Sequence, residues 1–225
     1  MEMQMYKGDE AFDKILEKFE VGKNVYEIKM YMLGFLWSPE NISPFDPLEE
    51  ILLKDTEDEI TFKDENEAGE FHSQYIALWN LLTSYEGSDS RYPKLSPRPD
   101  KITTKNDKVR YLTQRGKEVA SLVFGMDDSG ASEYIAQSID LTLRYFSLHI
   151  FEELLIQFLI EHEEGREFSA KKLDEIIMVA DDFEKNWHAI FKELNAVFLG
   201  LRRGTIPLQE PEEIEAMLEE MESHL

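Results

Sequence analysis

Apolar residues recur at every third or fourth position along most of the chain, which is the spacing of an amphipathic α-helix. A long uninterrupted stripe runs from Leu173 to Leu201. Residues 23–37 are apolar on nearly every side, which predicts a helix buried all round. No segment shows the two-residue alternation of a β-strand. The pattern therefore predicts an all-α fold.

Two long helices in the C-terminal half should form the spine of this fold. Ser132 and Ser169 are suitable N-caps, because a serine side chain accepts a hydrogen bond from the free N–H groups of a first helical turn. Gly165 breaks the chain between them. We expect helices at about 131–163 and 169–203, each about 50 Å long. The sequence therefore predicts a multi-helix bundle built around a long antiparallel helical hairpin.

The chain has one long segment with the composition of a linker. Residues 87–104 contain a glycine and three prolines among serines and lysines. We interpret the whole chain, residues 1–225, as a single all-helical domain. The linker would divide that domain into subdomains 1–86 and 105–225.

Short-range signals place several helix ends and contacts. Gly34 lies in the last turn of the helix at 23–37, where it would let a neighbouring backbone approach closely. Ser38 precedes Pro39 and should end that helix. Asp64 and Glu67 have the spacing of a capping box and should begin another helix.

Composition restricts the class of protein. The chain has 225 residues and a formal net charge of -23, yet 42% of its residues are hydrophobic, which predicts a folded protein with an acidic surface. It contains no cysteine, which excludes disulfides, thiolate catalysis and thiolate metal sites. The apolar run 141–160 contains four ionisable residues and is interpreted as a buried core helix, not a membrane span. No signal peptide is visible, so we expect a soluble, cytoplasmic protein with no membrane contact.

Positive charge is concentrated in one segment. Residues 91–117 carry nine basic side chains and two acidic ones. The acidic remainder repels phosphate backbones, so direct nucleic-acid binding is disfavoured. The basic segment would either contact an anionic partner or fold back onto the acidic surface of the protein itself. We favour the second interpretation, because carboxylates are abundant on the same chain.

One set of ionisable residues has the spacing of a metal site. His149 and Glu153 share one helical face, as do Glu184 and His188, and the predicted hairpin places both pairs at a similar level. Such a set could hold a divalent metal, the one cofactor that the sequence suggests. The alternative, which we favour, is that His149 is a buried core histidine and that Glu184 and His188 form a surface pair. No catalytic residue and no nucleotide-binding motif is found.

The last segment predicts an acidic amphipathic helix after Pro211. Its narrow apolar face would either close the bundle or dock into a groove of a partner protein. The residues of this candidate partner-binding face are Ile214, Met217, Leu218 and Met221.

The segment from Tyr31 to Leu53, with its Gly-Phe-Leu helix end and its proline-marked loop, resembles the bacterial YecA/YgfB-like helical proteins. Phe62 to Tyr85 continues the same order of elements, so the resemblance covers the first third of the chain. It implies a cytoplasmic all-helical protein and no family-wide enzymatic activity. The second half departs from the family pattern, and the cysteine-rich zinc tail of some relatives cannot form here.

These observations favour a non-enzymatic protein that binds another protein as a scaffold or regulator. The anionic surface would steer a basic partner. Two alternatives remain open: a metal-dependent enzyme that uses the four His and Glu residues, and an inhibitor that mimics the charge of a nucleic acid. The oligomeric state is also open, self-association included.

Overall fold

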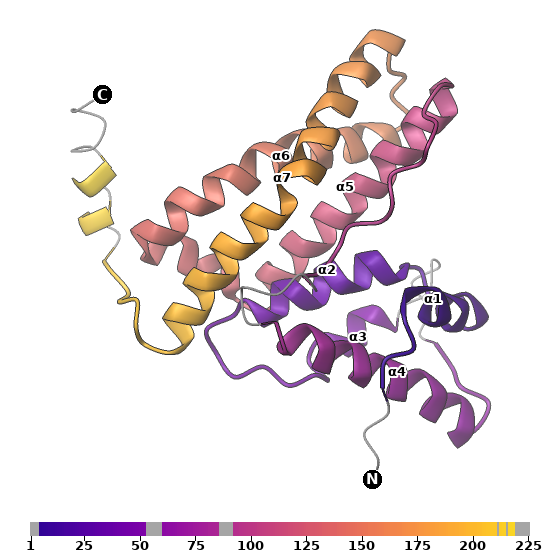
Figure 1. Cartoon of the computed structure of the whole chain (residues 1–225), viewed down its shortest axis with the longest axis horizontal. Helices are drawn as coiled ribbons and strands as arrows, with labels where there is room; N and C mark the ends of the chain where they lie inside the picture. Colours follow the sequence, from indigo (N-terminus) through magenta and orange to yellow (C-terminus); the bar gives the residue numbers. More distant parts are fainter. Residues whose placement is uncertain (1–4, 53–59, 86–91, 211, 215, 219–225) are drawn as a thin grey trace.

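The computed structural model describes residues 5–52, 60–85, 92–210, 212–214 and 216–218, and no β-strand occurs in these ranges. The predicted all-α class is therefore confirmed (Figure 1). In chain order the elements are α1 (Asp9–Lys18), α2 (Val25–Leu36), α3 (Leu48–Ile51), α4 (Glu65–Thr83), α5 (Lys105–Asp128), the 3-10 helix η1 (Ala131–Gln137), α6 (Ile139–Glu163) and α7 (Ala170–Arg202).

Helices α6 and α7 form the predicted antiparallel hairpin, and α5 packs along both of them (Figure 1). The turn contains Gly165 at a φ of 83°, a backbone conformation that glycine adopts without strain. Ser169 caps α7 as expected, because its side chain accepts a hydrogen bond from the N–H of Lys172. The 33 residues of α7 make it about 50 Å long.

The expected start of the first arm is wrong. Ser138, not Ser132, caps α6, and its hydroxyl accepts a hydrogen bond from the N–H of Leu141. Residues 131–137 form the separate helix η1. The Thr142 hydroxyl of α6 donates a hydrogen bond to the carbonyl oxygen of Ile135 in η1 at 2.7 Å. Helix α6 therefore has 25 residues and is about 37 Å long.

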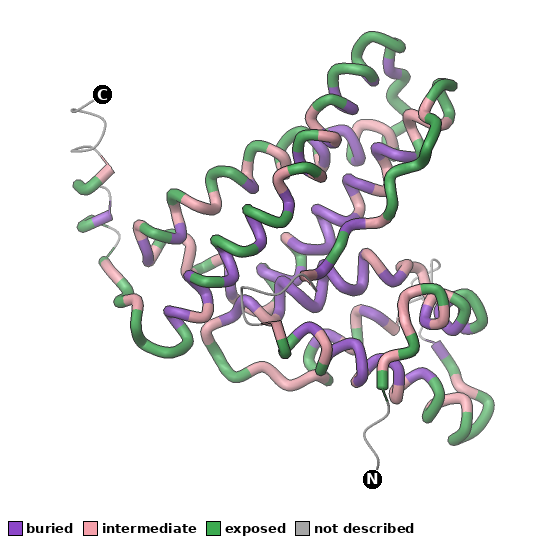
Figure 2. The backbone as a smooth tube through the Cα atoms, in the orientation of Figure 1, coloured by how far each residue is buried: buried purple, intermediate pink, exposed green. Residues whose placement is uncertain are grey.

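Helix α2 lies between two groups of helices and belongs to both hydrophobic cores, as its apolar pattern predicts. Figure 2 shows it buried along almost its whole length. One side, including Ile28 and Phe35, packs with α1 and α4. The other side, including Met30, Leu33 and Trp37, packs with α5 and α7. The division into subdomains at residues 87–104 stays a prediction, and the two cores meet at α2.

The α2–α5 crossing brings two backbones into direct contact. A Cβ added at Gly34 would lie 2.5 Å from the carbonyl oxygen of Leu122 on α5. A Cβ added at Gly125 would overlap the carbonyl oxygen of Tyr31 on α2. The expected close approach at Gly34 is confirmed, and the crossing uses a glycine from each helix.

The C-terminal end of α2 is joined to α7. The Trp37 ring is stacked on Phe198 with 5.3 Å between ring centroids, and its indole N–H donates to Asn195 Oδ1 at 3.3 Å. Arg202 donates to the carbonyl oxygens of Leu36 and Ser38, both at 2.5 Å. These contacts satisfy carbonyls that the end of a helix leaves free.

The expected capping box at the start of α4 is incomplete. Asp64 begins α4 by accepting from the N–H groups of Asn66 and Glu67, but the Glu67 carboxylate accepts from Lys63 and not from Asp64. A complete capping box occurs at α5, between Thr104 and Asp107. Within the described ranges, no helix combines the length and apolar character needed to cross a membrane.

Candidate functional site

The four residues of the predicted metal site do not converge. His149 contacts Glu153 on its own helix, with 3.4 Å between Nε2 and Oε1. Glu184 points toward α5, where its carboxylate accepts from Arg115 at 2.7 Å. The His188 ring is stacked on Tyr92 with 4.2 Å between centroids. No group of three or more His, Asp or Glu side chains placed to hold a metal is found among the residues that the structure describes.

The pair on α6 and the pair on α7 lie at nearly the same height along the hairpin, as expected, but their side chains point in different directions. Phe151 on α6 contacts Phe183 on α7, with 5.2 Å between ring centroids, so residues near 150 do face residues near 183. His149, however, lies on the outer side of α6 and is half-exposed. Its interpretation as a buried core histidine is therefore wrong. Glu184 belongs to an ion cluster with α5, not to the surface pair expected with His188.

The basic segment folds back onto the acidic surface of the protein, as favoured. Arg98 forms two hydrogen bonds with Asp181 on α7, at 2.7 and 3.0 Å. Lys108 pairs with Asp174 on the same helix. Arg91 lies outside the described residues. The Arg98 pair places the strap, residues 92–104, against α7, and the Lys108 pair joins α5 to α7.

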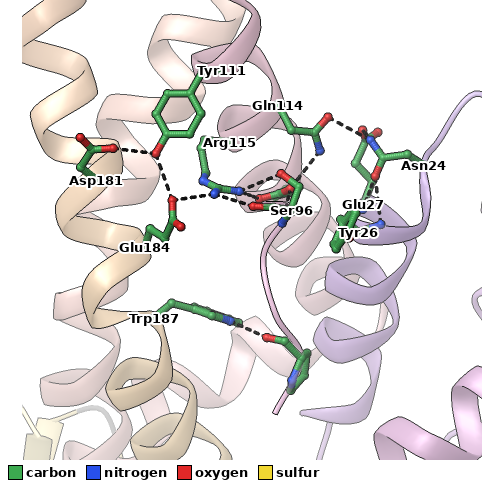
Figure 3. A network of polar contacts seen from close by, with 12 residues as sticks. Asn24, Tyr26, Glu27, Ser96, Tyr111, Gln114, Arg115, Asp181, Glu184 and Trp187 are labelled. Carbon is green, nitrogen blue, oxygen red and sulfur yellow. Dashed lines mark hydrogen bonds and ion pairs between the residues drawn. The ribbon is translucent and has the colours of Figure 1, made fainter. Parts of the chain in front are cut away.

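The centre of this contact is a buried cation, Arg115, whose side chain is 0% exposed (Figure 3). Its guanidinium donates to the Glu118 and Glu184 carboxylates, each at 2.7 Å, and to the hydroxyl and carbonyl oxygens of Ser96 in the strap. The Tyr111 ring lies 5.2 Å from the guanidinium carbon. Because buried charges are stable only when paired, this cluster holds the strap in place.

Beside this cluster a cleft of about 710 Å³ opens between α1, the start of α2, and α5. Glu27 lines it and is 6% exposed. Asn24 donates to the Glu27 carboxyl at 2.5 Å and to the Gln114 amide oxygen at 3.0 Å, which connects α2 to α5 (Figure 3). Burial raises the pKa of Glu27 from 4.5 to about 7, with Glu118 adding to the rise and Lys117 and Lys23 opposing it. Sequence patterns did not single out this residue.

Glu27 should make stability depend on pH. Because its pKa is raised on folding, its favourable contribution is present below about pH 4.5 and is lost as the pH rises to about 7. Glu27→Gln does not titrate, so the wild type should lose about 3 kcal/mol relative to this variant over that range. Urea unfolding of both proteins at pH 5 and pH 8 measures the change, with Glu193→Gln on the exposed side of α7 as the control. Equal pH dependence of Glu27→Gln and the wild type would contradict the assignment.

The residues of the predicted C-terminal partner-binding face differ in their exposure. Ile214 is buried, whereas Met217 is exposed and Leu218 is intermediate. Met221 lies outside the described residues. Gln209 joins the preceding segment to the end of η1 and the start of α6: its N–H donates to the Gln137 carbonyl oxygen at 2.8 Å, and its side-chain oxygen accepts from the N–H of Ile139 at 3.0 Å. Ile214 is therefore not available to a partner in this conformation, whereas Met217 is.

A different apolar surface is exposed. The α6 outer stripe consists of Leu143, Phe146, Ile150 and Leu154, which recur at helical spacing and are 42–63% exposed. The interpretation of residues 141–160 as a buried core helix is therefore only half right. Leu148 and Leu155 on the inner side are fully buried, and no described helix covers the outer side. Large apolar side chains gathered on one exposed face are typical of interaction surfaces.

Comparison of the chain with protein-family models, with curated proteins and with solved structures found no match. The resemblance of residues 31–85 to the YecA/YgfB-like proteins therefore stays a prediction.

Proposed function

We propose that this chain is a non-enzymatic, cytoplasmic helical protein that binds a basic protein partner through the α6 outer stripe. The observation that carries the proposal is the exposure of Leu143, Phe146, Ile150 and Leu154 along one face. A partner helix or extended segment with an apolar ridge would cover this stripe. The C-terminal face is the weaker candidate surface, because Ile214 is already buried.

Charge supports the choice of partner. The exposed carboxylates of Asp140, which is paired with Arg144, and of Glu153 lie on the same helix as the stripe, with side-chain exposures of 52% and 70%. The whole chain carries a net charge of -23, which attracts cations over long distances at low salt. Lysines or arginines beside the apolar ridge of the partner would therefore speed association and fix its orientation.

The two alternative functions have no such observation in their favour. A metal-dependent enzyme would need His149, Glu153, Glu184 and His188 together. His149 contacts Glu153, but Glu184 contacts Arg115 and His188 contacts Tyr92. A nucleic-acid mimic would need carboxylates in a regular row along one exposed face, and several exposed carboxylates are instead paired with the basic segment.

The proposal is tested with the double variant Phe146→Ser/Ile150→Ser. A photo-crosslinker at the edge of the stripe identifies a captured protein in lysate of the native cell, and the affinity of that purified protein is then measured. We expect the double variant to bind at least about tenfold more weakly, because apolar side chains at the centre of an interface dominate its affinity. Association should also slow as salt is raised.

The matched control is Phe45→Ser, which removes an equally exposed aromatic side chain from a loop. It should bind like the wild type. Equal affinity of the stripe variant and the wild type, or association insensitive to salt, would refute the proposal. Sedimentation of the purified chain adds a further outcome. A dimer that the double variant dissociates would assign the stripe to self-association instead.

A further inference from the structure

The cleft between α1, α2 and α5 has walls of opposite charge. Along α5, one helical face contributes polar and cationic side chains. These residues are Asn106, Arg110, Thr113, Gln114 and Lys117. The facing wall contributes the carboxyls of Asp13, Glu17 and Glu27 and one cation, Lys23, and His162 of α6 also lines the cleft. A smaller hollow of about 300 Å³ continues the cleft toward the strap and shares Asp13 and Arg110 with it.

The charges across this cleft do not pair with each other. Arg110 and Asp13 line both hollows, yet neither forms an ion pair within 4.0 Å with the other. Lys117 and Arg110 form no ion pair with any described residue, although the chain has 47 acidic residues for 24 lysines and arginines. Other described cations, such as Lys185 and Lys192, also form no ion pair, but Arg110 and Lys117 differ from them because they face carboxyls across the cleft. The open space of the cleft keeps these groups apart.

The three carboxyls of the facing wall outnumber its one cation, Lys23, whose ammonium group is already paired with Glu50. Burial raises the pKa of both Asp13 and Glu27, and the Asp13 carboxylate accepts only the N–H of Val25 at 2.8 Å among its hydrogen bonds. A cation brought into the cleft would favour the ionised form of each group. Thr113 adds a hydroxyl that is buried on the α5 wall and has no hydrogen-bond partner.

We propose that this cleft binds a small zwitterion, namely a short peptide with free amino and carboxyl ends. Its carboxylate would contact Arg110 and Lys117, and its ammonium group would contact Asp13 and Glu27. A volume of about 710 Å³ lies in the range of small-molecule sites and exceeds what a single ion fills. The site is separate from the α6 outer stripe and does not depend on the proposed protein partner.

Calorimetry with trialanine tests the proposal on the intact protein at pH 7.5. N-acetyl-trialanine lacks the ammonium group and trialanine amide lacks the carboxylate, and we expect each to bind at least about tenfold more weakly than trialanine. Glu27→Gln should remove most of the difference between trialanine and its acetylated form. Arg110→Gln/Lys117→Gln should remove most of the difference between trialanine and its amide. Such cycles assign each end of the peptide to one wall.

The affinity should also fall as the pH is lowered from 7.5 to 6, because Glu27 becomes protonated. The charged and titratable groups around it are Lys23, Asp13 and Glu17 on its own side of the cleft, Arg110, Lys117 and Glu118 on α5, and His162 on α6. Glu27→Gln should lose most of this pH dependence.

Lys192→Gln, on the exposed side of α7, makes the same change of charge as one of the cleft substitutions and should bind trialanine like the wild type. Thermal unfolding verifies that every variant is folded. No binding of trialanine at about 10 mM would overturn the proposal. The proposal would also be overturned if the blocked peptides bound as tightly as trialanine, or if Lys192→Gln weakened binding as much as the cleft substitutions. The cleft would then hold only water and small ions.

Discussion

Gly125→Ala is expected to destabilise the protein by about 3 kcal/mol or more. The added methyl group would overlap the carbonyl oxygen of Tyr31, and the α2 backbone cannot move away because both of its sides are packed. Gly34→Ala meets the α5 backbone at the same crossing and should have a similar effect. Urea unfolding followed by circular dichroism measures the change in the free energy of unfolding.

Gly69→Ala is the matched control for both variants. It also replaces a glycine inside a helix, α4, but a Cβ added there has no atom within 4 Å. It should stabilise the protein by about 0.5–1 kcal/mol, because alanine has the better helix propensity. If all three variants gave a gain of this size, the direct backbone contact between α2 and α5 would be disproved.

Arg115→Met should cost about 3–5 kcal/mol. The substitution keeps much of the side-chain volume but leaves the Glu118 carboxylate buried without its cation. It also removes the two hydrogen bonds that Arg115 donates to Ser96, so the strap should become sensitive to proteases. Chemical unfolding and limited proteolysis measure the two effects separately.

Two further variants show whether burial of the charge is the cause. Arg98→Met breaks an ion pair whose partners are both about 39% exposed, and it should cost at most about 1 kcal/mol. Arg115→Met/Glu118→Met removes both buried charges and should recover much of the loss. A double variant as unstable as Arg115→Met would show that volume and packing, not the unpaired carboxylate, determine the effect.

The fold could be predicted where the local pattern and the packing agree. Helix α2 is apolar on nearly every side and is buried on both, and Gly34 lies at the close approach that its position suggested. Helix α6 has the same kind of composition, but its outer side is exposed. Periodicity records which residues are apolar and not which helices are available to cover them. The start of α6 was missed for a related reason, because Ser132 and Ser138 are equally good caps.

The candidate sites depend on contacts between distant parts of the chain. Arg110 and Lys117 belong to the basic segment, whereas Asp13 and Glu27 come from the first two helices. Their joint placement on one cleft follows from the α2–α5 crossing, which no local pattern reveals. The His149 prediction failed at the same step. The hairpin gave the right level, but the rotation of each helix about its axis decides which side chains meet.

The shared position of α2 has a consequence for synthesis on the ribosome. Residues 1–85 emerge first, and the side of α2 that carries Met30, Leu33 and Trp37 has no cover until α5 and α7 have been translated. Throughout that interval the nascent chain exposes apolar side chains that can aggregate, so residues 1–85 are the part of the protein most in need of a chaperone.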